Sequence, residues 1–154
     1  MCKKATSLLW TLVRFKEHGA TTTQIVITYK IRIRYHLEFA SPVYHSSLTA
    51  EQSQQIERVQ KKALAVILGS SYMDYDNALA QVNLERLDVR RLEWCRKFAN
   101  NCVLSPKHSK LFPLNPAYRP KARTSKPFLE RFCRTSRHYN SAIPFLTRLL
   151  NSNH

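Results

Sequence analysis

Asp74 and Asp76 are the residues whose type and spacing come closest to metal-dependent chemistry. Phosphoryl transfer on nucleic acids uses two metal ions ~3.5–4 Å apart, which clustered carboxylates hold. Such a site also needs a third carboxylate from an earlier strand, and no segment of this chain is predicted to supply it. Asp74 is better explained as the N-cap of a short helix, because its side chain can accept a hydrogen bond from an unpaired backbone N–H. We therefore predict no catalytic residue here.

Five thiol and imidazole groups in the second half of the chain are enough in number for a tetrahedral zinc site. They are Cys95, Cys102 and His108, spaced C-x6-C-x5-H, and Cys133 and His138, spaced C-x4-H. Neither spacing is one of the short Cys pairs typical of structural zinc sites. Cys95 and Cys102 also fall on the apolar face of one predicted helix, which favours buried thiols that act as small hydrophobic side chains. We predict no metal site and no cofactor.

Glycine-dependent motifs are absent, because the chain contains only Gly19 and Gly69. A phosphate-binding loop, a dinucleotide fingerprint and a nucleophile elbow all need more glycines than that. Six histidines and many serines leave a nucleophile–base pair open, since one sequence does not reveal spatial neighbours. An independent enzyme is nevertheless not expected.

The net charge of +15 and the isoelectric point near 10.1 are the strongest compositional signals. From Trp94 onward, twelve Lys and Arg residues accompany a single acid, Glu130. This excess predicts a polyanionic partner, with nucleic acid ahead of an acidic membrane or an acidic protein, while solubility alone is the alternative. The four cysteines do not make a disulfide framework, and no apolar run approaches the ~18 residues of a membrane span. We expect an intracellular protein of the nucleus or cytoplasm without a membrane partner.

Basic residues interleaved with aromatic ones are the candidates for nucleic-acid binding, because Lys and Arg neutralise phosphates and aromatic rings stack on unpaired bases. On predicted helices the candidates are Arg32, Arg34, Lys61 and Lys62. In the C-terminal part they are Arg119, Lys121, Arg123, Lys126, Arg134 and Arg137, interleaved with Tyr118, Phe128, Phe132 and Tyr139. For the helical pairs, a solvated helix face is an equally good explanation.

Capping and apolar periodicity predict the helices that would position these side chains. The clearest helix follows Thr49, where Gln52 completes a capping box, and ends before Gly69. Its predicted apolar face is Ile56, Val59, Ala63, Leu64 and Ile67. Further helices are predicted over Ala5–His18, after caps at Asp74 and Asp88, and over Ser141–Leu150. Pro42 biases Ser41 away from helix and predicts an element end near Ala40, and five prolines between Ser105 and Pro127 predict an extended loop.

The segment Thr21–Phe39 satisfies two patterns at once. Apolar residues alternate strictly from Ile25 to Phe39, which is typical of a strand. The segment is long for a strand, however, since strands usually have ~5–6 residues. Ile25, Tyr29, Ile33 and Leu37 also recur every four residues, as on one face of a helix. The pattern alone favours a strand, and the choice between helix and strand stays open at this point.

An ordered series of motifs resembles one known family. Its main part is Ile33-Arg34-x-x-Leu37-Glu38-Phe39-Ala40-x-Pro42-Val43-Tyr44-His45, followed by Ile56-Glu57-Arg58-Val59-Gln60-Lys61-Lys62-Ala63-Leu64. Shorter matches are Tyr75-x-x-Ala78-Leu79, Leu84-x-x-Leu87, Arg90-Arg91, Cys95-x-Lys97-Phe98, Ser105-Pro106-Lys107-His108, Arg137-x-x-Asn140-Ser141-x-Ile143-Pro144 and Leu149-Leu150-Asn151. The series resembles the C-terminal portion of jockey-like non-LTR retrotransposon reverse transcriptases, whose pattern is roughly I-R-x-x-L-E-Y-A-x-P-V-W and then I-E-x-V-Q-(K/R)-(K/R). Phe39 and Tyr44 stand where that family usually has Tyr and Trp.

The resemblance implies a thumb and post-thumb region that lies downstream of the polymerase palm, and it implies a helix over Thr21–Phe39. Tyr72-Met73-Asp74-Tyr75 differs by one residue from the Tyr-Met-Asp-Asp loop of retroviral reverse transcriptases, but the resemblance places it beyond the active site. The expected fold is therefore all-α, a small antiparallel helical bundle with a Pro-rich basic C-terminal extension. The expected divisions are a bundle over 1–104, a linker over 105–127, and a basic tail with a terminal helix over 128–154.

The function that follows is that of a truncated C-terminal reverse transcriptase fragment without the catalytic carboxylates. Its expected partners are RNA or an RNA–DNA duplex, and the missing polymerase palm is a further candidate. The alternative is a stand-alone basic helical adaptor, domesticated or host-derived, that binds RNA or an acidic protein.

Overall fold

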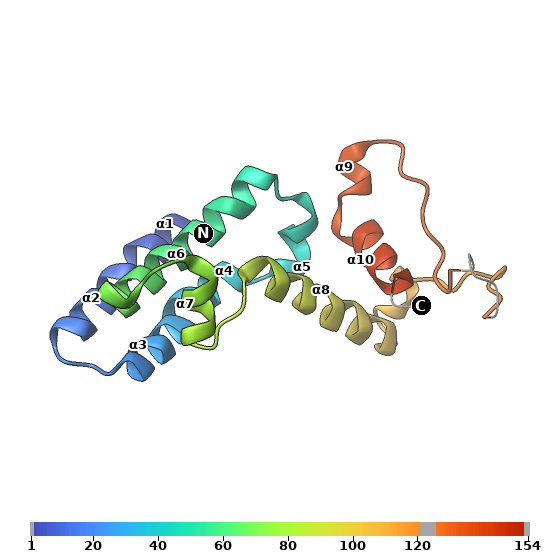
Figure 1. The fold of residues 1–154 in the computed structure, drawn as a ribbon. Coiled ribbons are helices and arrows are strands. Elements are labelled where there is room, and N and C mark those ends of the chain that lie inside the picture. The colour runs from blue at the N-terminus through green and yellow to red at the C-terminus, as the bar shows by residue number, and fades with distance from the viewer. Residues whose placement is uncertain (1, 121–125, 153–154) are drawn as a thin grey trace. The chain divides into compact units, whose positions relative to one another are not determined.

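A computed structural model describes residues 2–120 and 126–152 and shows an all-α protein (Figure 1). Within these two ranges no β-strand forms, and one isolated antiparallel bridge pairs Leu114 with Phe128. The predicted all-α class is confirmed, while the antiparallel bundle topology and the Pro-rich C-terminal extension stay predictions. None of the described helices is both long and apolar enough to cross a membrane.

The chain divides into two compact units, and the boundary falls inside a helix. The first unit comprises the chain up to Phe39 together with Thr49–Arg90, and the second comprises Ala40–Leu48 and the chain from Arg91 onward. The predicted divisions after residues 104 and 127 stay predictions.

The first unit is built from short helices around one long helix. It contains α1 (Cys2–Ser7), α2 (Leu9–Glu17), α3 (Thr22–Thr28), the π-helical segment η1 (Tyr29–Arg34), α4 (Tyr35–Glu38), α6 (Ala50–Leu68), the 3-10 turn η3 (Gly69–Ser71), α7 (Tyr75–Gln81) and the first residues of α8 (Leu87–Leu104). The second unit contains α5 (Ser41–Tyr44), the 3-10 turn η2 (His45–Ser47), the rest of α8, the 3-10 turn η4 (Ser109–Leu111), α9 (Ser136–Tyr139) and α10 (Ala142–Asn151).

Helix α6 forms as its sequence predicts. Thr49 and Gln52 make a reciprocal capping box, with Gln52 N–H donating to Thr49 Oγ1 at 3.2 Å and Thr49 N–H donating to Gln52 Oε1 at 3.0 Å. Its buried residues include all of the predicted apolar face, Ile56, Val59, Ala63, Leu64 and Ile67. Gly69 follows the last turn with a positive φ, so both predicted ends are confirmed.

Two rows of helix, α1–α2 and α3–α4, pack beside α6 and run in opposite directions. Helices α1, α2, α3 and α7 all pack on α6. Lys16, at the end of α2, donates to the carbonyl oxygens of Val66 at 2.7 Å and Ile67 at 3.3 Å, so α2 and α6 end side by side. Helix α4 returns to contact α1, so the α3–α4 row runs opposite to the α1–α2 row. Lys16 places a positive charge against the free carbonyls of the α6 C-terminus, where the helix dipole favours it.

The segment Thr21–Phe39 is helical from Thr22 to Glu38. The family resemblance implied this helix, whereas the alternation of apolar residues had favoured a strand. Its alternating apolar residues separate into two stripes. Ile25, Tyr29, Ile33 and Leu37 are buried, whereas Ile27, Ile31, Tyr35 and Phe39 are exposed. A strict four-residue repeat drifts around an ideal helix of 3.6 residues per turn, and the wider turns of η1 compensate for that drift. The π-helical segment thereby keeps one stripe in the core.

Three local predictions need correction. The helix predicted over Ala5–His18 is interrupted at Leu8, which separates α1 from α2. Asp88 is not an N-cap, because α8 already begins at Leu87; the backbone N–H of Asp88 donates instead to Glu57 Oε1 at 2.8 Å. Ser41 is helical despite the following proline, because Ala40 turns the chain with a φ of 56° and starts α5 afresh.

A buried polar network joins the elements of the first unit through Gln60. Tyr29 Oη donates to Gln60 Oε1 at 2.5 Å, and Gln60 Nε2 donates to Tyr75 Oη at 3.0 Å and to the Glu85 carbonyl at 2.9 Å. Tyr75 Oη in turn donates to Glu57. Burial raises the pKa of both tyrosine hydroxyls above the ordinary value, so they remain donors at neutral pH.

The second unit has its own apolar core, which includes residues on both sides of the Leu114–Phe128 bridge. The core consists of Cys95, Ala99, Cys102, Phe112, Phe128, Leu146, Leu149 and Leu150. Leu129 N–H donates to the Pro113 carbonyl and Asn115 N–H to the Pro127 carbonyl, each at 2.9 Å. Asn151 of α10 holds this bridge by accepting from Phe128 N–H at 3.0 Å and donating to its carbonyl at 3.1 Å.

Replacing Gln60 tests whether the network supports the first unit. The change Gln60→Leu leaves Tyr29 Oη and the Glu85 carbonyl without these hydrogen bonds, and each unpaired buried group costs about 1–3 kcal/mol. We expect the free energy of unfolding to fall by about 2–4 kcal/mol, measured by urea denaturation with circular dichroism. Gln54→Leu, on the exposed side of the same helix, is the control and should change it by less than about 0.5 kcal/mol. Equal effects of the two changes would contradict a supporting role for the network.

Replacing Gly69 tests the end of α6. A Cβ there would lie 2.5 Å from Lys16 Nζ, whereas a Cβ at Gly19 meets nothing within 4 Å. Both glycines have a positive φ, 58° at Gly69 and 77° at Gly19, so the Lys16 contact distinguishes them. We expect Gly69→Ala to destabilise by about 1–3 kcal/mol and Gly19→Ala by less. In a double-mutant cycle, Lys16→Ala should recover part of the Gly69→Ala loss, and strict additivity would rule out the Lys16 contact as its cause.

Candidate nucleic-acid interface

A groove of about 500 Å³ lies between α1 and α6, and three cationic side chains line it. They are Lys3 from α1 and Arg58 and Lys62 from α6. Arg58 and Lys62 are four residues apart, so successive turns of α6 present both of them on one face. The remaining lining residues are Cys2, Thr6, Ser7, Gln55 and Val59. The groove therefore combines three positive charges with hydroxyl and amide groups.

The charges in this groove are not compensated within the described part of the chain. Lys3, Arg58 and Lys62 are exposed, and no hydrogen bond or ion pair joins any of them to another described residue. Like charges four residues apart on a helix destabilise it by roughly 0.2–0.5 kcal/mol. An anion in the groove would remove that repulsion and gain charge-assisted hydrogen bonds.

The helical candidates have different surroundings. Arg32 and Lys61 are exposed, and Lys61 Nζ lies 4.8 Å from the centroid of the Tyr75 ring. Lys62 lines the basic groove. Arg34 is turned inward, with its side chain only 16% exposed. Of the four, Lys62 is the one that lines this groove.

Arg34 belongs to a half-buried ion cluster. Glu38 accepts from Arg90 through Nε at 2.5 Å and through Nη2 at 3.3 Å, and its Oε1 lies 3.7 Å from Arg34 Nε. Burial, together with the charge of Arg90, lowers the pKa of Arg34 below its ordinary value. Hydrogen bonding to Glu38 raises the pKa of Arg90. The Glu38–Arg90 contact joins α4 to α8 within the first unit, and Arg34 is turned toward the same carboxylate.

The C-terminal candidates are surface residues of the second unit. Arg119, Lys126, Arg134 and Arg137 are exposed. Lys126 Nζ forms an ion pair with Glu130 at 2.8 Å. Lys121 and Arg123 lie outside the described residues.

The two aspartates have structural roles. Asp74 caps α7, as predicted, by accepting from Asn77 N–H at 2.8 Å. Asp76 lies 3.8 Å from Arg86. Among the residues in 2–120 and 126–152, no three His, Cys, Asp or Glu side chains group as metal ligands would. Cys95 and Cys102 are buried in the core of the second unit, as predicted.

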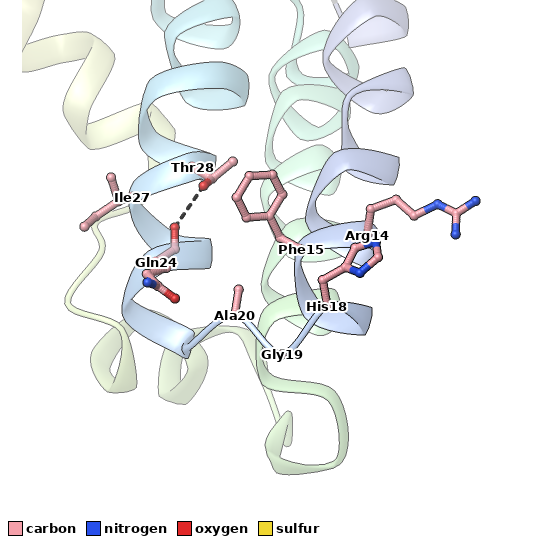
Figure 2. A pocket seen from close by; sticks show the side chains of 8 residues that line it. All are labelled: Arg14, Phe15, His18, Gly19, Ala20, Gln24, Ile27 and Thr28. Atoms are coloured by element: carbon pink, nitrogen blue, oxygen red, sulfur yellow. Dashed lines mark hydrogen bonds between the residues drawn. The ribbon is translucent and has the colours of Figure 1, made fainter.

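A larger groove of about 640 Å³ between α2 and α3 has a different character. Figure 2 shows Phe15 extending from α2 toward Thr28 on α3, while the guanidinium of Arg14 points away from them. Arg14 is already paired with Glu17 at 3.1 Å. The lining is mainly apolar, so this groove does not suit a phosphate.

Lys3 and Arg58 were missed at the level of sequence. Arg58 could have been found from sequence, because it lies four residues before Lys62 on the helix that the Thr49 cap predicts. No sequence pattern indicates Lys3, because only the packing of α1 on α6 brings it to the groove.

Comparison with known proteins identifies no relative, since no family model, curated protein or solved structure matches the chain.

Thiol labelling tests the placement of the cysteines. Burial raises the pKa of Cys95 to about 11 and raises that of Cys102 as well, so both remain thiols at mildly alkaline pH in the folded protein. The unfolded thiol ionises near ~8.5, so the contribution of Cys95 to stability is present below that pH and is lost as the pH rises toward about 11.

We expect iodoacetamide at mildly alkaline pH to modify the half-buried Cys2 and Cys133 first, as peptide mass spectrometry would show, and all four cysteines only in denaturant. Rapid native labelling of Cys95 would show that the second-unit core is not formed in solution.

Proposed function

We propose that this chain binds the phosphate backbone of RNA or an RNA–DNA duplex without catalysing a reaction on it. The observation that carries the proposal is the basic groove of Lys3, Arg58 and Lys62, in which three uncompensated cations converge. The net charge of +15 supports it, because long-range attraction concentrates a polyanion near the surface.

The resemblance to the C-terminal portion of jockey-like reverse transcriptases supports the same ligand. In this proposal the chain corresponds to the thumb side of such an enzyme and grips template–primer or element RNA in the nucleus or cytoplasm. Glu57 and Gln60 of the I-E-x-V-Q run lie in the buried network, while Arg58 and Lys62 of the same helix face the groove. One helix would thus serve both folding and phosphate contact.

Catalysis is not part of the proposal. Asp74 and Asp76 serve as a helix cap and an ion-pair partner, and neither meets a further carboxylate in a metal-binding group within the described ranges. The parent activity would require the polymerase palm, which we propose as a second partner.

A salt series tests phosphate binding by the groove. Neutralising Lys3, Arg58 and Lys62 with glutamine should weaken binding to single-stranded RNA, measured by fluorescence anisotropy. It should also reduce the slope of log affinity against log salt by about 2, because each lost contact with a single strand accounts for about 0.7.

The matched control removes three charges elsewhere, through Arg14→Gln, Lys107→Gln and Lys110→Gln, and should leave most of the slope intact. An equal loss in both triple variants would mean that net charge, and not the groove, determines binding. A folded wild-type chain that binds neither RNA nor an RNA–DNA duplex would overturn the proposal.

A protein-binding adaptor is the second candidate function. The exposed stripe of Ile27, Ile31, Tyr35 and Phe39 favours it, because such a row of apolar side chains often marks a protein contact. A well-folded chain without nucleic-acid affinity would point to this function.

A further inference from the structure

A pocket of about 430 Å³ in the second unit has a composition unlike that of the basic groove. Its lining consists of Glu130, Arg131, Phe132, Cys133, Tyr139, Pro144 and Arg148. The volume falls in the range of small-molecule sites, ~300–1,000 Å³. Two aromatic rings and a stacked guanidinium make it a site for a flat ligand.

Phe132 is the main feature of this pocket. Its side chain is 88% exposed, which is the highest exposure of any large aromatic residue in the described ranges. A phenyl ring in water on a charged segment contributes nothing to the core of the unit. An exposed ring of this kind is what proteins use to stack on an unpaired base.

Another part of the pocket lining is preorganised. Arg148 Cζ lies 3.6 Å from the centroid of the Tyr139 ring, and Arg148 Nη2 donates to the Tyr139 carbonyl at 2.9 Å. Helix α9, which carries Tyr139, is fixed by its Thr135 cap, where His138 N–H donates to Thr135 Oγ1 at 3.2 Å. The Arg148 guanidinium therefore already lies over the Tyr139 ring before any ligand binds.

Glu130 is the acidic side chain in the lining of this pocket. Burial raises its pKa, but hydrogen bonds from Lys126 and Asn151 and the charge of Arg148 outweigh burial, so the pKa lies below its ordinary value and the group is ionised. Its Oε2 accepts from Lys126 Nζ at 2.8 Å and its Oε1 accepts from Asn151 Nδ2 at 3.0 Å, so the carboxylate is held in place and its charge is paired.

Three exposed arginines in or near the pocket lining are available to the phosphates of such a ligand. Arg131, Arg134 and Arg137 are exposed, and no ion pair joins any of them to a residue of the described ranges. They flank the aromatic pocket along the chain, in the order arginine, aromatic, arginine. Alternation of phosphate contacts with stacking rings is the arrangement that single-strand binding proteins use.

We propose that this pocket, between Phe132 and the Tyr139–Arg148 stack, binds an unpaired nucleobase of a single-stranded nucleic acid. The proposal rests on the proposed nucleic-acid binding but concerns a different site with a different chemistry, base stacking instead of phosphate neutralisation. It gives the chain a means of distinguishing single strands from duplexes, since paired bases are not available for stacking.

The test uses the full chain and a short oligouridine RNA that carries one central 2-aminopurine and a terminal dye. Dye anisotropy reports binding of the strand, and quenching of 2-aminopurine fluorescence reports stacking of the base. We expect wild-type protein to give both signals. Phe132→Leu should abolish most of the quenching and weaken binding by about fivefold or more, because it removes the ring and keeps an apolar side chain.

Two control variants separate the sites. Phe39→Leu removes an exposed ring of the first unit and should change neither signal. The basic-groove triple variant should weaken binding but retain quenching in the bound state. An oligothymidine DNA with the same probe determines whether the base is taken from RNA or DNA.

Each other result contradicts the proposal in a recognisable way. Anisotropy without quenching in the wild type would overturn the base pocket and leave phosphate binding intact. Quenching that survives Phe132→Leu would place the stacked base elsewhere. A folded chain with neither signal would overturn both the base pocket and the proposed function.

Discussion

The first unit depends on one buried side chain, the carboxamide of Gln60. An amide without partners is costly in an apolar interior, so the fold must bring donors and acceptors to it. Tyr29, Tyr75 and the Glu85 carbonyl do so from three segments. Helix α7, which carries Tyr75, and the loop that carries Glu85 are too short to be stable alone. Gln60 thus links local elements to α6, and it requires them to dock in one register.

The parts of the fold that sequence predicts are those determined by neighbouring residues. Thr49 with Gln52 and the Asp74 cap act within one turn, so both helix starts can be read directly. Asp88 failed as a predicted cap because Glu57, distant in sequence, accepts from its backbone N–H. Periodicity alone predicted a strand over Thr21–Phe39, because the two apolar stripes of this helix interleave in the sequence. A π-helical segment keeps one of these stripes buried, and the sequence pattern does not show it.

The residues of the candidate site likewise divide into those that the sequence predicts and those that tertiary packing determines. Lys62 was predicted from a basic pair on an amphipathic helix, and the basic groove contains it. Arg34 was predicted by the same reasoning, yet Glu38 four residues later pairs with it and draws it inward. A basic residue on a helix is therefore a weak indicator until its neighbours at four residues are considered. Lys3 shows the remaining limit, because only tertiary packing brings it to Arg58 and Lys62.

The distribution of acids explains why the two units offer different sites. By sequence, the first unit has eight acids for twelve Lys and Arg, and the second has two for thirteen. In the first unit the acids Glu38 and Glu57 are used in the interior, so the cations they do not meet, Lys3 among them, remain for a ligand. In the second unit Glu130 is an acid of the surface pocket itself. Glu130 is already paired with Lys126, and two arginines line the same pocket, so in the proposal the two aromatic rings, and not the charge, suit this pocket to a base.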